Sequence, residues 1–231
     1  MSGLHPVIAY ALTVLSAHVL AGESAPALPP KPPAESHPLT CTIRCAEPII
    51  VLGKTPTITV TITNRTKQDV VLVGSLDGSD GRRFPYCQFD VQNADGTSAM
   101  KPTKGLCGYK NMLRKQDFVT VPAEMDFDPF KKIDSYGFFG PSGLNTNTFD
   151  KLGTYRITFF YSTKNDDILA WAGNDSRSDA NILASDGKHP VTTDAALLAL
   201  FKQVPKLELT SNTLTITVVA SPVTQPSAIQ K

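Results

Sequence analysis

Four cysteines are the residues of this chain whose types and spacing offer the most chemistry. They are Cys41, Cys45, Cys87 and Cys107, in a chain of 231 residues. An even number of cysteines in an exported chain favours disulfide bonds, and four cysteines allow three pairings. Metal binding is the weaker interpretation, because no second pair repeats the close spacing of a thiolate knuckle. We therefore expect disulfides, and neither a metal centre nor a cofactor.

The spacing of the cysteines limits how they can pair. On one extended strand the Cα atoms of Cys41 and Cys45 would lie roughly 13 Å apart. A disulfide needs about 4.4 to 6.8 Å between Cα atoms, so a Cys41–Cys45 bond requires a bulge or turn; otherwise each pairs with Cys87 or Cys107. We expect a Cys87–Cys107 bond, because Cys87 lies on an alternating strand and Cys107 in an irregular segment that needs anchoring.

Histidine and the usual catalytic motifs indicate that the chain is not an enzyme. Of four histidines only His189 follows residue 38, whereas a zinc site normally uses several His or Cys ligands. A Ser–His–Asp triad would have to use His189, and no Gly-x-Ser-x-Gly elbow accompanies it. The sequence also lacks a phosphate-binding Gly-rich loop and a dinucleotide fingerprint. We expect no catalytic residues.

Carboxylates are the remaining candidates for chemistry. Asp126 and Asp128 would share one face of a strand, and Asp166 and Asp167 are adjacent. Glycoside hydrolysis needs two carboxylates facing each other across a cleft, which spacing cannot establish. A richer cluster has oxygen ligands of the kind calcium prefers, but it lacks the calcium-loop register. Its members are Asp166, Asp167, Asn174, Asp175, Asp179 and Asn181. We interpret these carboxylates as solvated loop charges, with a carboxylate-dependent hydrolase as an alternative function.

Composition and charge describe an ordinary globular protein. The hydrophobic fraction is 41% and the formal net charge is +1. Nucleic-acid binders concentrate basic charge on one face, so we expect no nucleic acid as a partner. The basic pairs Arg82-Arg83 and Lys131-Lys132 are interpreted as solvated loop charges.

The first 38 residues resemble a leader and a spacer. Residues 7–21 form an uncharged apolar run of the length of a secretory h-region, followed by small residues. We predict a signal peptide over 1–22, a mature chain that begins between about Gly22 and Ala27, and a secreted or periplasmic location. An uncleaved anchor is the alternative; after processing we expect no stable membrane span. Residues 23–38 contain six prolines and predict a disordered, Pro-rich spacer.

Period-two alternation then predicts strands over residues 39–220. The clearest is Thr55–Thr63, in which Ile58, Val60 and Ile62 alternate with threonines, so that one face is buried. Further strands are predicted over 39–44, 49–52, 69–73, 84–91, 118–121, 154–162 and 213–219. Seven or eight short strands separated by turns predict an all-β, two-sheet sandwich of immunoglobulin type. Residues 221–231 are predicted to be a disordered tail.

One helix interrupts this pattern, in the long connection 164–210. Leu197, Leu200, Phe201 and Val204 follow one another at helical spacing, and Pro205 ends the run. Thr193 and Asp194 supply capping chemistry, so the helix is predicted over 193–204. We expect its apolar face to pack on the sandwich; a helix that binds a partner is the alternative. Two sequons, at Asn64 and Asn174, matter only in a eukaryotic source.

The strand segments resemble a known class of domain. The run PIIVLGKTPTITVTITNRTKQDVVL (residues 48–72) is similar to the opening of exported bacterial immunoglobulin-like domains of uncharacterised function. FDVQNADG, DFVTV, GTYRITFFY and SNTLTITV resemble their later strands, and a fainter likeness points to the bacterial intracellular proteinase inhibitor family. The chain departs from the class in Gly53-Lys54-Thr55, the cysteines and the long connection. No functional residue is transferred by this resemblance.

The function expected from the sequence is therefore that of a non-catalytic module. We expect an exported binding or structural domain of the cell envelope, with a protein or envelope component as its partner. A secreted proteinase inhibitor, with the Cys107 region as its exposed loop, is the second alternative beside the hydrolase.

Overall fold

A computed structural model describes residues 38–101, 112–131, 140–141, 144–173, 182–184, 190–192 and 194–221. Within these residues the chain is mostly β-structure with one α-helix, as the alternating sequence predicts. The signal peptide, the spacer, the tail, Cys107 and His189 lie outside the described residues. Among the described residues, no helix is long and apolar enough to span a membrane.

The first sheet is built around the Thr-rich strand. Strand β3 (Ile58–Asn64) pairs antiparallel with β1 (Leu39–Cys45) and with β7 (Asp126–Phe127). A second antiparallel pair joins β4 (Val70–Val73) to β6 (Phe118–Val121). Because β4 follows β3 and β6 precedes β7, these two pairs form one antiparallel arrangement of residues 58–73 with residues 118–127. The pairing is interrupted between the β3–β7 pair and the β4–β6 pair.

Asn64 lies buried in that interruption and connects its parts. Its Nδ2 donates hydrogen bonds to the carbonyl oxygens of Gln68 (2.8 Å), Val121 (3.1 Å) and Pro122 (3.1 Å). Its Oδ1 accepts from both the backbone N–H and the hydroxyl of Thr66. The side chain thereby supplies the hydrogen bonds that the two strands do not make to each other at this point.

The second sheet is centred on the long strand β8 (Gly153–Ser162). One edge of β8 pairs antiparallel with β5 (Tyr86–Asn93). The other edge pairs antiparallel with β12 (Leu214–Val219) and then with β11 (Glu208–Thr210). Strand β2 (Ile49–Val51) pairs parallel with β12 and is the last strand of this sheet. The remaining strands, β9 (Ile182–Ala184) and β10 (Pro190–Thr192), form a separate hairpin.

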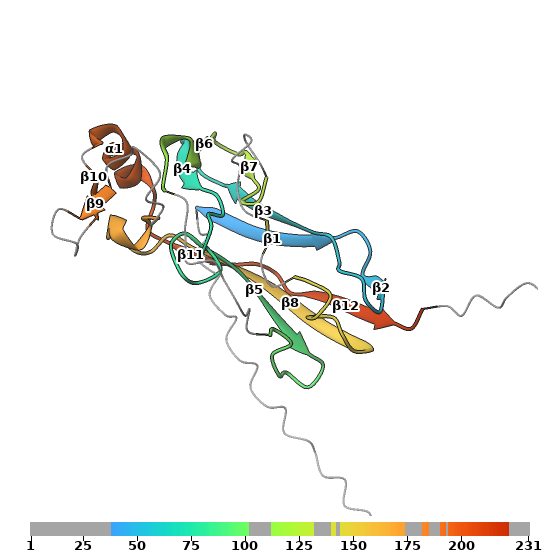
Figure 1. The fold of residues 1–231 in the computed structure, drawn as a ribbon. Helices are drawn as coiled ribbons and strands as arrows, with labels where there is room; N and C mark the ends of the chain where they lie inside the picture. Colours follow the sequence, from blue (N-terminus) through green and yellow to red (C-terminus); the bar gives the residue numbers. More distant parts are fainter. Residues whose placement is uncertain are drawn as a thin grey trace, which may run out of the picture. The chain divides into compact units, whose positions relative to one another are not determined.

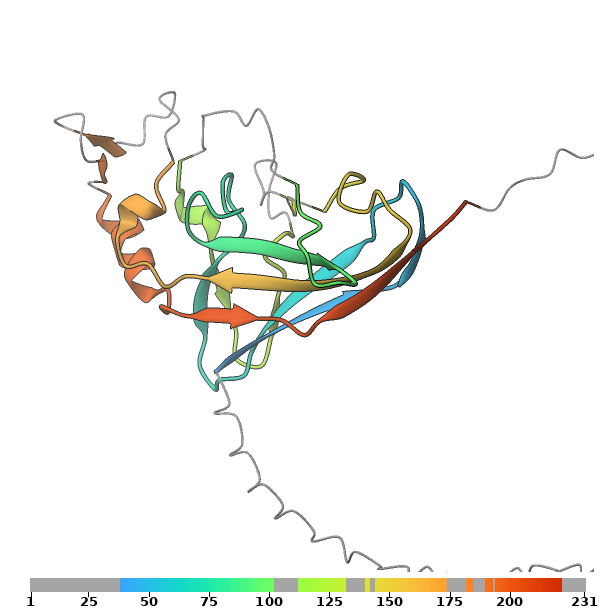
Figure 2. The same ribbon diagram turned by 90° about the horizontal axis from the view of Figure 1, so that it is seen from below.

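The main hydrophobic core lies between these two sheets. Figures 1 and 2 show β1 and β3 in one layer and β5, β8 and β12 in the other. Both layers contribute residues to one buried cluster, which includes Ile43, Val60 and Ile62 from the first sheet and Phe89, Ile157, Phe159 and Ile216 from the second. In β1, β5 and β12 the buried residues alternate with more exposed ones, as a half-buried strand requires.

Two polar contacts fasten the ends of this core. Tyr155, at the start of β8, donates its hydroxyl hydrogen to the carbonyl oxygen of Lys151 at 2.9 Å. The side chain of Asn212, which lies between β11 and β12, forms two hydrogen bonds with the backbone of β1. Its Oδ1 accepts from the N–H of Ile43 (2.8 Å), and its Nδ2 donates to the carbonyl of Ile43 (3.2 Å). The second contact links the two sheets along one edge.

A second buried cluster lies under the helix α1 (Ala195–Gln203). Leu197, Phe201 and Val204 are buried in it together with Trp171, and the rings of Phe201 and Trp171 are 5.4 Å apart in an edge-to-face arrangement. Asp194 caps the helix by accepting hydrogen bonds from two backbone N–H groups. Two 3-10 turns, η1 (Lys115–Asp117) and η2 (Ile168–Ala170), complete the described elements.

The structure corrects the interpretation of the Arg82-Arg83 pair. Arg82 is exposed and pairs with Asp80, but Arg83 is only 3% exposed. Burial lowers the pKa of Arg83 to about 10, while the charges of Asp117 and Asp77 act in the opposite direction. The guanidinium also donates to the carbonyl of Asp77. Leu76 and Phe84, which lie on either side of Arg83 in the chain, are buried in the second cluster, and Arg83 is buried as well.

Candidate functional site

Strand β2 forms an edge of the second sheet, and its backbone positions it against β12. Thr217 N–H donates to the carbonyl of Pro48 (2.8 Å), and Leu52 N–H donates to the carbonyl of Val219 (2.9 Å). In the strand order β2 stands at the end, so within the described part of the chain its far edge pairs with no strand. Such an edge is a template for pairing with another chain.

Exposed apolar side chains lie at β2 and at the neighbouring ends of β12 and β8. We name Ile49, Leu52, Leu152 and Val219 the β2 patch; their exposed fractions are 64%, 42%, 57% and 38%. Ile49 pairs with Thr217, so it lies on the same outer face as Val219, two residues further on. Leu152 directly precedes Gly153, which pairs with Val218. Among the described residues only one other large apolar side chain, Met125, is comparably exposed.

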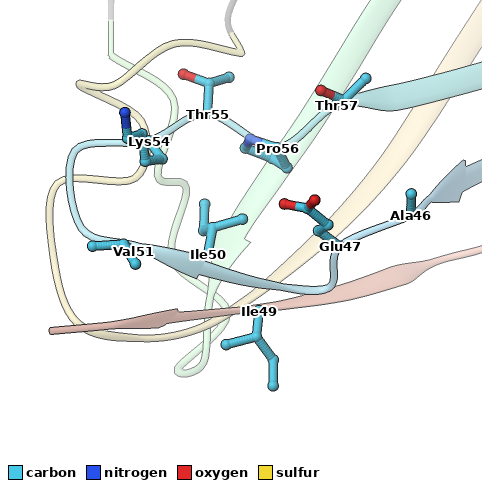
Figure 3. Close-up of a pocket in the computed structure, with 9 residues that line it drawn as sticks. All are labelled: Ala46, Glu47, Ile49, Ile50, Val51, Lys54, Thr55, Pro56 and Thr57. Carbon is cyan, nitrogen blue, oxygen red and sulfur yellow. The ribbon is translucent and has the colours of Figure 1, made fainter. Parts of the chain in front are cut away.

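A cleft of about 460 Å³ lies on the inner side of the same strand. Figure 3 shows the segment Lys54–Thr57 arching over β2, with the side chain of Ile50 pointing toward it and that of Ile49 pointing away. Pro56 is buried, whereas Glu47 and Lys54 are exposed. Neither Glu47 nor Lys54 makes an ion pair with another described residue. The edge therefore combines apolar surface with one unpaired charge of each sign.

The cysteines do not form the site that the sequence predicts. Cys41, Cys45 and Cys87 are free thiols, so the predicted Cys87–Cys107 bond is wrong for this structure. The alternation of β5 turns Cys87 into the main core opposite its pairing partner Tyr161, and Cys107 lies outside the described residues. Burial raises the pKa of the Cys41 thiol to about 12 and raises that of Cys87 further. Neutral thiols of this kind are inert at physiological pH.

The apolar face of the helix, for which partner binding is the alternative hypothesis, packs against other residues of the same chain. Leu197 and Phe201 are buried, Leu200 is half-buried, and Val204 is buried just after the helix ends. Lys206 extends over this region, with its Nζ 3.9 Å from the centre of the Phe201 ring and 5.2 Å from that of Trp171. Figures 1 and 2 place α1 and β2 at opposite ends of the sheets. The helix face is therefore separate from the β2 patch.

The described carboxylates have local structural roles. Asp126 accepts a hydrogen bond from Thr63 (2.6 Å), and Asp128 accepts from the backbone N–H of Phe130. Asp167 caps η2. Within the described residues no three His, Cys, Asp or Glu side chains are grouped as metal ligands would be. Asn174, Asp175, Asp179, Asn181 and His189 lie outside these residues, so the calcium and triad hypotheses are not tested.

One sequon has a structural role. Asn64 is 0% exposed and its Nδ2, the atom that would carry a glycan, already donates to backbone carbonyls. Glycosylation at Asn64 would therefore require this part of the sheet to open. The sequence offered no signal for this burial, because the Asn64-Arg65-Thr66 pattern is that of an exposed turn.

Comparisons with known proteins do not assign this chain to a family. No protein-family model matches the chain, and no curated protein matches it either.

Proposed function

We propose that this chain is an exported, non-catalytic immunoglobulin-like module that binds a protein partner of the cell envelope through the β2 patch. The proposal combines the predicted signal peptide over residues 1–22 with the strand pairing and the exposed edge. The single observation that carries the binding role is the exposed apolar side chain of Ile49 on the edge strand β2, with Leu52, Val219 and Leu152 exposed on neighbouring segments. Contiguous exposed apolar surface on a soluble domain is typical of interaction sites.

The strand pairing supports the immunoglobulin-like assignment. If β1, β3, β5, β7, β8 and β12 are taken as strands A, B, C, E, F and G, one sheet is A-B-E and the other contains C-F-G. This is the division of strands found in immunoglobulin domains. The bond from the Tyr155 hydroxyl to Lys151 further corresponds to the tyrosine corner, which lies at the start of strand F.

The form of the β2 edge favours a protein as the partner. An edge strand offers backbone hydrogen bonds to an extended segment, while neighbouring side chains supply apolar contact. The cleft beside β2 is open and bordered by the charges of Glu47 and Lys54, whereas Asp126 and Asp128, the candidate carboxylates of a hydrolase, are held in local hydrogen bonds. The Cys107 region, the candidate loop of an inhibitor, lies outside the described residues.

Capture experiments with three matched proteins test the proposal. The full chain, exported with its own leader, is used as bait for envelope extract, beside the variants Ile49→Asn and Met125→Asn. Both substitutions are at exposed sites, so both variants should fold as the parent does. We expect a specific partner that is lost with Ile49→Asn and retained with Met125→Asn. Equal capture by all three proteins, or capture by none, would overturn the proposal.

A further inference from the structure

The backbone of β2 presents free hydrogen-bonding positions along its outer edge. Because Pro48 and Leu52 bond to β12, residues 48, 50 and 52 direct their backbone groups toward β12, and Ile49 and Val51 direct theirs away from it. The carbonyl of Val51 accepts from Lys54 N–H. The N–H and C=O of Ile49 and the N–H of Val51 thus face outward.

Apart from its shortness, β2 lacks the features that normally block pairing along an exposed edge strand. Proteins place charged residues, prolines or bulges on exposed edges to prevent pairing with other chains. Ile49, Ile50 and Val51 carry neither a charge nor a proline, and the first is the most exposed large apolar residue described. The shortness of β2 limits how strong such pairing can be.

The charges at the two ends of β2 indicate what pairs with it. Glu47 precedes the strand and Lys54 follows it, and each lacks an ion-pair partner among the described residues. In an antiparallel arrangement of two identical edges, the acidic end of one copy meets the basic end of the other, twice. A parallel arrangement would bring like charges together. The edge is therefore self-complementary, as a two-fold interface requires.

We propose that two copies of this chain associate through antiparallel pairing of their β2 strands about a two-fold axis at Ile50. This register sets Ile49 of each copy opposite Val51 of the other, so that the outward N–H of Val51 can donate to the outward C=O of Ile49, once from each copy. Glu47 of one copy then lies beside Lys54 of the second. The second sheets of both copies join into one, and their β2 patches form a continuous apolar surface. The inference goes beyond the proposed function, and it names a second copy of the chain as the occupant of the β2 edge.

Charge reversal tests this register directly. Sedimentation velocity on the full chain, over a range of concentrations, is compared for the parent, Glu47→Lys, Lys54→Glu and an equimolar mixture of these two variants. We expect the parent to dimerise and each single variant to dimerise at least tenfold more weakly. The mixture should recover, because a Glu47→Lys chain carries two positive charges that face two negative ones on its Lys54→Glu partner.

Further outcomes separate this inference from the proposed function. A parent that stays monomeric into the high-micromolar range, or single variants that dimerise as the parent does, would overturn the dimer. A monomeric parent that still captures an envelope protein through Ile49 would overturn the dimer and leave the proposed function standing. A dimer that depends on β2 but captures no envelope protein would overturn the proposed function and leave the dimer standing. Thermal unfolding of each variant verifies that the fold is retained, and Met125→Asn is the control outside the edge.

Discussion

Replacing Asn64 by aspartate gives the sharpest test of how the first sheet is held together. The substitution keeps the shape of the side chain but turns its donor nitrogen into an acceptor oxygen. In the structure Nδ2 faces three backbone carbonyls, those of Gln68, Val121 and Pro122, at 2.8 to 3.1 Å. The variant would therefore bring a carboxylate oxygen against three acceptors at a fully buried position.

The size of the effect can be worked out from these contacts. The amide has two hydrogens, so the variant loses two hydrogen bonds of about 1 kcal/mol net each, and the loss of a donor to the carbonyl of the buried Val121 costs about 1–3 kcal/mol more. We expect Asn64→Asp to lower the free energy of unfolding by about 3–5 kcal/mol near neutral pH. Urea denaturation followed by tryptophan fluorescence measures it, since the chain has a single, buried Trp171.

The pH dependence of the stability of Asn64→Asp provides a second, independent test. The new carboxyl would be buried among acceptors, which raises its pKa in the folded protein above the ordinary value of about 3.9. Its protonated form can donate one hydrogen bond, so the stability lost to the substitution should shrink as the pH falls through the folded pKa. Asn147→Asp, at an exposed site, serves as the control and should change stability by less than about 0.5 kcal/mol. A neutral-pH loss below about 1 kcal/mol for Asn64→Asp would refute the reasoning.

Three further predictions concern the two buried clusters. Phe201→Ala should cost about 3–5 kcal/mol, because the ring is buried against Trp171, while the exposed Lys202→Ala should cost little; urea denaturation checks both. In native protein at mildly alkaline pH, iodoacetamide should label Cys45 far faster than Cys41 or Cys87, and all three alike in urea; peptide mass spectrometry that found equal native labelling would contradict the burial. Because burial raises the Cys41 pKa from 9.0 to about 12, its contribution to stability is complete below about pH 9 and is lost as the pH rises toward 12; denaturation curves for the parent and Cys41→Ala should converge over that interval.

Periodicity in the sequence located most of the sheet. The segments 39–44, 55–63, 84–91, 154–162 and 213–219 all overlap strands, because each must bury one face and alternation records that requirement. The helix, predicted over 193–204, spans Ala195–Gln203, with its start set by the Asp194 cap and its end by Pro205. Strands β7 and β11 were missed, since two or three residues are too few to show a period.

Tertiary context decided what the sequence could not. The run from Ile49 to Leu52 is apolar throughout, so nothing in it shows that Ile49 faces solvent until its parallel pairing with β12 is known. Arg83 resembles an ordinary loop charge, yet the segment around it folds inward and buries it. In the same way, the sequence alone did not show which side of β5 faces the core, so it did not predict that Cys87 is a buried, free thiol.

The side chain of Asn212 takes the place of a missing strand. It satisfies both backbone groups of Ile43, so the outer edge of β1 cannot recruit a neighbouring chain at that position. The molecule thus has one edge that is sealed by its own amide and another, at β2, that is left open. Removing that amide would leave both backbone groups of Ile43 without these bonds and would open a second position for pairing, on the edge of β1.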